Sequence, residues 1–461
     1  MISFSCIDTI IILSFFFILV LIGFIAGRKS KNDAESFLLS GRNLNLFLFI
    51  LVNVSTWYGG ILGVGEFTYR YGLASWFTQG LPYYLFAFLF AIFLSKKIRN
   101  SSLYTIPDKI TITFGKNAGL WSAFLVFVLV SPAPYLLMLG NLLTLIFPVD
   151  LLTALIIAVT LSIVYLFFGG FRSNVFVDSF LFFVMFGGFI LVFFILITSF
   201  GGVEFLVESL PQEHLTVTGG ASPVFIIVWF LIALWTFADP GFHQRTYAAK
   251  TSNVAKWGII ISIFFWALFD FLTNSIGLYS KAILPDLTTP VLSYPLLAEK
   301  VLNPGVKGLF YAAMFATILS TANSFLFLSA STIGKDFFFL FSKEKKDESI
   351  KKYTNIGLLI TAVFSITLAY FVSSVIEIWY ILGSICIPGL LVLIFVSYSE
   401  KLQYMKREIV LLSVFSVITS AAWFIIRPFF QNEVLSMIEP MIAGIVAIFI
   451  FIIIIWIKKS F

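Results

Sequence analysis

Long apolar runs separated by short polar segments dominate the sequence. A bilayer core of about 30 Å requires roughly 20 apolar residues for each helical crossing, so the runs predict an all-α, polytopic membrane protein with about thirteen transmembrane helices. We treat residues 1–461 as a single transmembrane domain. The spans are expected at residues 8–27, 44–69, 73–95, 119–147, 150–169, 174–199, 222–242, 255–280, 305–333, 353–373, 376–398, 409–427 and 438–457.

Composition agrees with this class. Of the 461 residues 60% are hydrophobic and 11% are charged, which is more apolar surface than a soluble domain can bury. No hydrophilic stretch is long enough for a soluble catalytic domain, and the two histidines, His214 and His243, show no pairing with a nucleophile. We therefore expect no enzyme. Cys6 and Cys386 lack the spacing of a metal site, and the dispersed net charge of +6 gives no reason to expect nucleic acid as a partner.

The basic residues predict the orientation in the membrane. With the N-terminus outside and the C-terminus in the cytoplasm, 24 of the 29 Lys and Arg residues fall in cytoplasmic segments, as the positive-inside rule requires. The exceptions are Arg70, Lys281, Lys300, Lys307 and Arg427. We expect an integral protein of the cytoplasmic membrane whose first span is retained, because basic residues follow that span rather than precede it.

Four acidic residues fall inside or at the edge of spans, where a charge is costly without a partner or a wet cavity. They are Glu66, Asp178, Asp239 and Asp270. Asp239 is expected at a salt-bridged helix end, whereas Asp178 lies about 8 Å into its span at 1.5 Å per residue and requires a partner. Glu66 and Asp270 could face a cationic group of a solute or pair with Arg70 and other donors.

Small polar residues form a stripe in the ninth span. Thr317, Ser320, Asn323 and Ser324 share one helical face and Thr321 flanks it, because residues three and four apart lie above one another. Their oxygens could coordinate a hard cation. Alternatively, they could allow close helix packing and bond back to carbonyls of their own helix. Four such residues within 320–324, near a buried aspartate, favour the cation site.

The second span has the composition of a discontinuous helix. It reads LVNVSTWYGGILGVGEF over residues 51–67, with hydroxyl side chains followed by four glycines. Unwound backbone at this depth exposes carbonyl oxygens that can bind an ion.

At these residues the chain resembles the sodium/solute symporter family. The resemblance covers nearly the whole chain and rests on eight motifs in order: SFLLSGRNLN (36–45), NVSTWYGG (53–60), SLYTIPDKITITFGKN (102–117), GGFRSNVFVDSF (169–180), DPGFHQRTYAAKTSNVAKWG (239–258), FDFLTNSIGLYSKA (269–282), MFATILSTANS (314–324) and GSICIPGLL (383–391).

The resemblance implies the LeuT fold, which has two inverted repeats of five helices. Here the repeats would be spans 2–6 (residues 44–200) and 7–11 (220–400), with an N-terminal helix and loop (1–43) and two C-terminal helices (405–461) added. The sequence itself shows no internal repeat. Spans 2 and 7 would be broken at mid-membrane. Span 7 has no glycine before Gly241, so its break would have to be formed by Thr236 and its neighbours.

The resemblance also implies the ligands. A principal sodium site would use the backbone carbonyls of Leu51, Val54 and Thr317 with the hydroxyls of Ser320 and Thr321. Asp178, Ser320, Asn323 and Ser324 would hold a second sodium or line the path by which sodium leaves. No other metal and no cofactor is implied. The candidate substrate-binding residues are Asn53, Ser55, Thr56, Trp57, Tyr58, Gln79, Tyr83, Tyr135, Trp235, Thr236, Trp379 and Tyr380.

Together these features predict a sodium-coupled symporter that imports a small organic solute by alternating access, with Na⁺, the solute and the lipid bilayer as its partners. Two alternatives stay open: coupling to protons, which Asp178 could carry, and a transporter-like membrane sensor of solute. The sequence does not indicate the solute, the number of sodium ions or the oligomeric state.

Overall fold

The structure, a computed structural model, describes residues 2–29, 33–343, 346–372, 374–375, 378, 380–399, 406–430, 435 and 438–460. Throughout these ranges the chain is helical apart from its connections, and the one β-type contact is an isolated bridge between Leu44 and Ala249. The prediction of an all-helical chain is confirmed. Nine helices in the described part are long and apolar enough to cross a membrane, and three shorter apolar helices accompany them.

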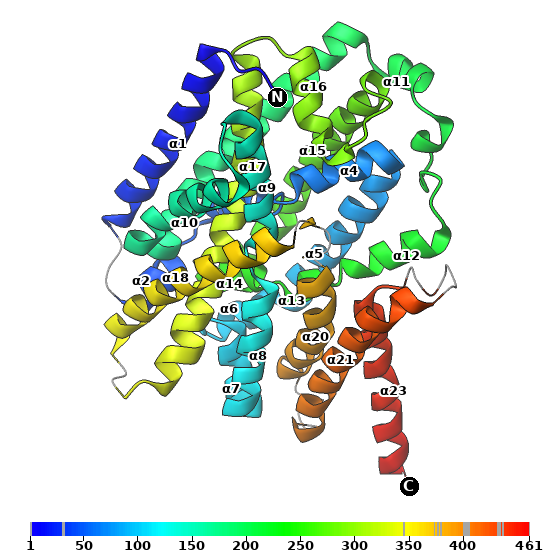
Figure 1. Ribbon diagram of the computed structural model, residues 1–461. Helices are drawn as coiled ribbons and strands as arrows, with labels where there is room; N and C mark the ends of the chain where they lie inside the picture. Colours follow the sequence, from blue (N-terminus) through cyan, green and yellow to red (C-terminus); the bar gives the residue numbers. More distant parts are fainter. Residues whose placement is uncertain are drawn as a thin grey trace.

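Figure 1 shows how the helices are arranged. Those of the first half are α1 (Cys6–Gly27), α2 (Ala34–Leu39), α3 (Leu46–Ser55), α4 (Ile61–Tyr71), η2 (Trp76–Gly80), α5 (Leu81–Phe93), α6 (Ser95–Asn100), α7 (Ile106–Phe114), α8 (Lys116–Leu129), α9 (Ala133–Ile146) and α10 (Leu151–Phe200). Those of the second half are α11 (Val203–Ser209), α12 (Pro223–Ile232), α13 (Trp235–Ala238), α14 (Pro240–Ala248), α15 (Ser252–Ile283), α16 (Ser293–Val301), α17 (Val306–Ser331), η5 (Thr332–Phe339), α18 (Asp347–Phe371), η6 (Tyr380–Ser384), α20 (Ile385–Ser397), α21 (Lys406–Ile426) and α23 (Pro440–Ser460). The count of thirteen crossings and the two five-helix repeats stay predictions.

Several predicted spans are interrupted. The second span is unwound over residues 56–60, between α3 and α4, where the glycines and hydroxyl residues predict a break. In the seventh span the helix is interrupted at residues 233–234 and again at Asp239, so Thr236 lies in the short helix α13 between the two interruptions. The fourth span is broken at residues 130–132, between α8 and α9, which the hydrophobic pattern did not predict. Pro132 lies in this break, and Pro134 lies at the start of α9.

The fifth and sixth predicted spans are joined without a loop, as the single helical element α10. The chain turns at Gly170, whose φ of 54° lies in the left-handed region that favours glycine. A Cβ at this position would lie 2.5 Å from the carbonyl oxygen of Phe37, so the close approach of the segment before α3 also requires glycine.

The ninth span, α17, lies at the centre of the bundle, whereas α1 and α23 lie at its outer edges (Figure 1). All the residues of its most apolar window are buried, and it packs against α1, α9, α10 and α18. By contrast, α1 exposes large apolar side chains such as Phe17, which is 70% exposed. Such outward apolar faces are expected where lipid covers the protein.

Segments that the orientation rule assigns to the cytoplasmic side lie together in space. Arg42 donates hydrogen bonds to the carbonyls of Tyr247 (3.2 Å) and Ser102 (3.0 Å), although these residues come from three different parts of the chain. Lys335, which lies in η5 just after α17, forms an ion pair with Asp108 of α7. The contacts agree with the sorting of these connections onto one side of the bundle.

A buried aspartate joins the first helix to the central one. Asp8 of α1 is fully buried, and its Oδ1 accepts hydrogen bonds from the backbone N–H groups of Gly305 and Gly308, both at 2.8 Å. These N–H groups belong to the start of α17, where no intrahelical partner exists. Asp8 therefore caps α17 from a neighbouring helix and places a negative charge at its N-terminus, which the helix dipole favours.

We expect Asp8→Ala to destabilise the protein by about 3 kcal/mol, because four charge-assisted hydrogen bonds are lost and buried N–H groups remain without partners. Two of them come from the start of α17, and two come from the N–H and hydroxyl of Ser5, which Oδ2 accepts in the capping box of α1. The apparent melting temperature of the purified protein in detergent measures this effect. Asp150→Ala is the matched control: Asp150 is exposed and caps the N-terminus of its own helix through Thr153, a contribution of about 1 kcal/mol. Equal shifts in the two variants would contradict the bridging role.

Candidate functional site

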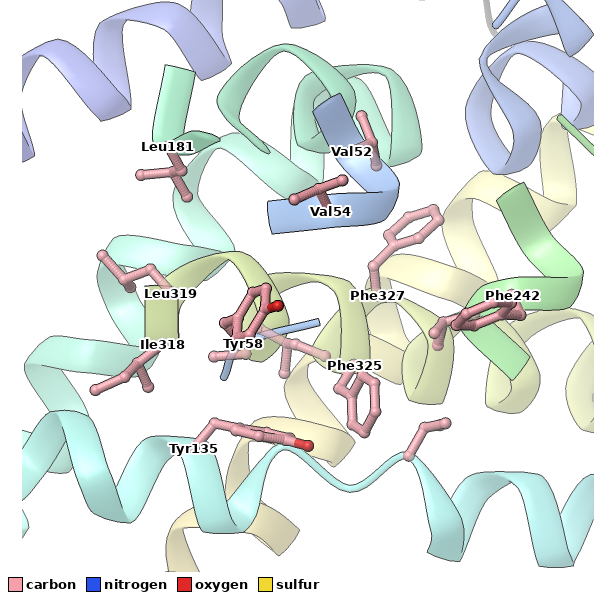
Figure 2. Close-up of a cluster of buried hydrophobic side chains, with 14 of the residues drawn as sticks. Val52, Val54, Tyr58, Tyr135, Leu181, Phe242, Ile318, Leu319, Phe325 and Phe327 are labelled. Carbon is pink, nitrogen blue, oxygen red and sulfur yellow. The ribbon is translucent and has the colours of Figure 1, made fainter. Parts of the chain in front are cut away.

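The break in the second span lies against α17. The hydroxyl of Thr321 donates a hydrogen bond of 2.9 Å to the backbone carbonyl of Thr56, the first unwound residue. Gly59 makes this approach possible, because a Cβ there would lie 2.4 Å from the Cβ of Thr321 and 2.7 Å from Cε1 of Tyr135. Figure 2 shows Val54, Tyr58 and Tyr135 near the α17 residues Ile318 and Phe325. The structure thus brings together the two segments in which the sequence predicts the principal sodium site.

The five predicted sodium ligands differ in their local bonding. Leu51 and Val54 lie in the last turns of α3, and the carbonyl of Val54 accepts a hydrogen bond of 3.2 Å from the N–H of Trp57. The hydroxyl of Thr317 bonds back to the carbonyl of Met314 at 2.7 Å, whereas those of Ser320 and Thr321 reach other elements. Back-bonding therefore explains Thr317, but it does not explain Ser320 and Thr321.

Asp178 has polar partners from two helices. Ser320 donates to Asp178 Oδ1 at 2.8 Å, and Ser324 contacts Oδ2 at 3.5 Å. Asn174, four residues before Asp178 in α10, donates to Oδ2 at 2.8 Å and also contacts the hydroxyl of Ser324 at 2.8 Å. All of these side chains are buried. The predicted partner of Asp178 thus exists, but Asn174 was missed, although its spacing from Asp178 places both on one helical face.

Two buried amide side chains, those of Asn174 and Asn323, have atoms that no hydrogen bond satisfies in the part of the chain that the structure describes. Among the described residues, both amide atoms of Asn323 and the Oδ1 of Asn174 are without a hydrogen-bond partner. Buried polar atoms in proteins are nearly always satisfied by protein, water or an ion. These oxygens are therefore available for a ligand beside Asp178.

A cavity of about 210 Å³ opens beside the break. Seven of the predicted substrate-binding residues line it: Thr56, Trp57, Tyr58, Gln79, Tyr83, Tyr135 and Trp235. Eight of the 22 described residues that line it are aromatic. Tyr135 meets Phe325 edge to face, with ring centroids 5.1 Å apart (Figure 2). A mostly apolar cavity with a few convergent polar groups is typical of sites for small organic molecules.

Three other predicted substrate-binding residues do not line the cavity in the part of the chain that the structure describes. Asn53, Ser55 and Thr236 are buried behind its wall, and Asn53 Oδ1 accepts a hydrogen bond of 2.9 Å from Nε of Arg245. Trp379 lies outside the described residues, and the structure does not describe the side chain of Tyr380. Asn53 therefore holds a charged residue at the cavity.

Three charged residues line the cavity, namely Asp239, Arg245 and Asp270. Of these, Asp270 was considered from the sequence as a possible contact for a cationic solute, whereas Asp239 and Arg245 were not predicted as solute contacts. Asp239 ends the seventh span and caps α14, because its Oδ1 accepts the N–H of Phe242 at 2.8 Å. Among the described residues no ion pair of Asp239 is found, so the expected salt bridge is not confirmed. Arg245 lies in the same helix, α14, and the sequence alone did not indicate that its side chain lines the cavity. Further lining comes from Gly60, Gly63, Val64, Phe67, Trp229, Ile232, Asn274, Thr321, Phe325, Ser384, Ile387 and Met441.

Glu66 and Asp270, for which the sequence left two roles open, differ in their surroundings. Glu66 forms an ion pair of 3.0 Å with Arg70, one helical turn later. Asp270 accepts a hydrogen bond from the hydroxyl of Tyr84. Within the described residues no Lys, Arg or His forms an ion pair with it.

Comparison with known proteins identifies the family. The pattern of the sodium:solute symporter family matches residues 37–402. The chain belongs to this family. Its members are transporters rather than enzymes, and Na⁺ is their coupling ion.

Individual relatives are transporters of different solutes. This chain is 25% identical to the high-affinity choline transporter 1 of Drosophila melanogaster over 86% of this chain and 67% of the relative. It is 25% identical to the sodium/pantothenate symporter of Haemophilus influenzae, over 74% of each chain.

Solved structures show the same fold in other transporters. A Na⁺-coupled sialic acid symporter, in a substrate-bound outward-open state, matches with a TM-score of 0.77 and 16% identity over 96% of this chain and 97% of that one. A nucleobase-cation-symport-1 family transporter in a closed conformation matches with a TM-score of 0.58 and 13% identity over 94% and 96%. This family member is therefore a multi-pass membrane protein with a transporter fold.

We expect Gly59→Ala to separate the break from α17, because the added methyl group would overlap with Thr321 and Tyr135. The variant should melt at a lower temperature and should lose most of the stabilisation that sodium chloride gives relative to potassium chloride. Gly187→Ala is the matched control, since Gly187 lies in α10 and a methyl group added there would meet no atom within 4 Å. A sodium response in Gly59→Ala equal to that of the control would contradict the role of this contact.

Proposed function

We propose that the protein imports a small organic solute together with Na⁺ across the cytoplasmic membrane by alternating access, with its N-terminus outside and its C-terminus inside. The observation that carries the proposal is the contact of Thr321 with the unwound residue Thr56 beside an aromatic cavity. An ion bound at this contact and a solute bound in the cavity would share the same segment. Membership of the sodium:solute symporter family supports the coupling ion.

The proposed principal sodium site combines the backbone carbonyls of Leu51, Val54 and Thr317 with the hydroxyls of Ser320 and Thr321. Neutral oxygens suit a hard monovalent cation, and without a carboxylate in the inner shell the ion can be released. The hydroxyls of Ser320 and Thr321 already donate their hydrogens to Asp178 and Thr56, so their oxygen lone pairs remain free to face a cation.

Asp178, Ser320, Asn323 and Ser324 form the proposed second sodium site or the path by which sodium leaves. We add Asn174 to this set because it holds both Asp178 and Ser324. Asn323 supports an ion here, since its buried amide oxygen has no hydrogen-bond partner within the described ranges. The hydroxyl of Ser320 links the two proposed sites, because it donates to Asp178 while its neighbour Thr321 donates to Thr56.

The proposed solute site is the cavity beside the break. Its aromatic wall, with Gln79, Asn274 and Ser384 as polar contacts, fits a small amphipathic solute. Choline, pantothenate and proline are the first solutes to test, because the names of similar proteins carry them. Proline is included because a sodium/proline symporter of Staphylococcus aureus is 26% identical to this chain over 78% of this chain and 75% of the relative.

A polar network joins several connections at the end of the bundle opposite to Asp8. Lys335 pairs with Asp108, Thr105 donates to Asp336 at 2.9 Å, and the hydroxyls of Tyr247 and Tyr398 are 3.1 Å apart. These contacts join connections that the orientation rule places in the cytoplasm. We therefore propose that this network is the cytoplasmic gate and that it must separate before solute and sodium can leave.

Tyr104 forms part of this network. The cationic groups of Arg42 and Lys335 lie 5.1 and 5.4 Å from the centroid of its ring. Burial raises the pKa of Tyr104 above its ordinary value, so the ring stays neutral and offers its face to both cations.

Replacing Ser320 and Thr321 together by Ala should weaken sodium binding by about tenfold or more, equal to about 1.4 kcal/mol, because two ligand oxygens are lost. The measurement is the rise in melting temperature with sodium concentration, followed by uptake of the three solutes into proteoliposomes driven by a sodium gradient.

Ser331→Ala with Thr332→Ala is the matched control for this test, since this adjacent pair lies in the same span and bonds back to the carbonyl of Leu328. It should keep the sodium response. Normal sodium-dependent uptake in the Ser320/Thr321 variant would refute the site.

The proposed orientation predicts which side of the membrane each loop faces. In a variant with Cys6→Ser and Cys386→Ser, a membrane-impermeant maleimide should label Asn303→Cys in intact cells. It should label Asn117→Cys only after the cells are permeabilised. Both positions are exposed. The reverse pattern would show that the orientation is wrong.

The two alternatives give different results in the same assays. Proton coupling predicts uptake that depends on pH and persists when potassium replaces sodium. A membrane sensor predicts solute binding without net transport, together with a protein partner that copurifies. Neither has an observation in its favour that matches the contact between Thr321 and Thr56.

A further inference from the structure

The charges in the cavity wall are not balanced. Arg245 and Asp239 flank the same glycine: a Cβ on Gly241 would lie 2.9 Å from Asp239 Oδ1 and 3.1 Å from both terminal nitrogens of Arg245. Their opposite charges therefore attract each other across a short distance, although no direct ion pair joins them within the described residues. The remaining charged residue of the lining, Asp270, has no such neighbour.

Asp270 is buried and has a neutral hydrogen-bond partner. It is 6% exposed and lies past the middle of α15. The hydroxyl of Tyr84 donates to Oδ2, and the indole N–H of Trp76 donates to the oxygen of Tyr84 at 3.2 Å. A phenol donates a hydrogen bond to a carboxylate but does not neutralise its charge. In the part of the chain that the structure describes, no basic side chain is within ion-pair distance.

Inside a membrane a carboxylate without a counter-charge is costly, so a cation that enters the cavity gains from its presence. The aromatic wall indicates what kind of cation fits. Trp57, Tyr83, Trp229 and Trp235 line the cavity, and the ring of Trp57 is 5.1 Å from that of Tyr83. Aromatic faces attract organic ammonium groups, whereas a small metal ion requires several oxygen ligands.

We infer that the transported solute carries a positively charged amine or quaternary ammonium group and that Asp270 is the residue that receives it. The inference rests on the proposed function, because it takes the cavity to be the solute site. An uncharged solute would leave the carboxylate uncompensated. A purely anionic solute would bring a second negative charge to it.

The test compares charged solutes with uncharged ones of matched size on the purified protein in sodium chloride. The pairs are choline with 3,3-dimethylbutan-1-ol, pyrrolidine with cyclopentanol, and butylamine with butanol. At least one cation should raise the melting temperature of the wild-type protein and bind more than about tenfold tighter than its uncharged partner, since a buried charge pair contributes several kcal/mol. Asp270→Asn should lose this preference.

The control is Asp286→Asn, which makes the same change of charge at an exposed position outside the cavity and should bind the cation like the wild-type protein. Stabilisation by sodium alone must persist in Asp270→Asn, which shows that the variant is folded. The inference is overturned if no cation stabilises the wild-type protein, if uncharged partners bind equally well, or if Asp270→Asn binds the cation normally. Failure of the proposed function gives a different result, namely no stabilisation by sodium in the wild-type protein.

Discussion

The hydrogen bond between the Thr321 hydroxyl and the Thr56 carbonyl joins an unwound segment to the most deeply buried helix of the bundle. A bilayer offers no water to backbone groups that leave a helix, so each must find a partner in the protein or in an ion. The hydroxyl of Thr56 contacts the carbonyl of Val52 at 2.7 Å, and Thr321 satisfies the carbonyl of Thr56 itself. The cavity depends on this arrangement, because Trp57 and Tyr58 reach it from the unwound residues.

The parts of the site that the sequence could predict are those with local signals. The break in the second span follows from hydroxyl residues and glycines within 53–60, and the stripe on α17 follows from helical spacing. The α8/α9 break also had a local signal in Pro132 and Pro134, which the hydrophobic pattern obscured. By contrast, the bond from Arg245 to Asn53 joins residues 192 positions apart, and no local pattern encodes such a contact. Only the packing of helices determines it.

Glu66 and Asp270 show the same limit for charges. A partner one turn away can be found in the sequence, as Arg70 is for Glu66. The lack of a partner cannot be found in this way, because a counter-charge for Asp270 could come from any helix that packs against α15. The fold was needed to show that its neighbours are Tyr84 and a cavity rather than a basic residue. An unpaired charge in a membrane therefore becomes informative only when its surroundings are known.

The geometry also bears on how ion and solute would be coupled in the proposed transport cycle. Thr321 of α17 and Thr56 of the unwound segment both line the cavity, and the hydroxyl of Thr321 donates a hydrogen bond to the carbonyl of Thr56. A sodium ion that holds these two elements together would order the cavity wall and lower the cost of binding the solute. By linkage, the solute would raise the affinity for sodium by the same factor. No long pathway between the sites is required, because both ligands act on the one short segment that separates α3 from α4.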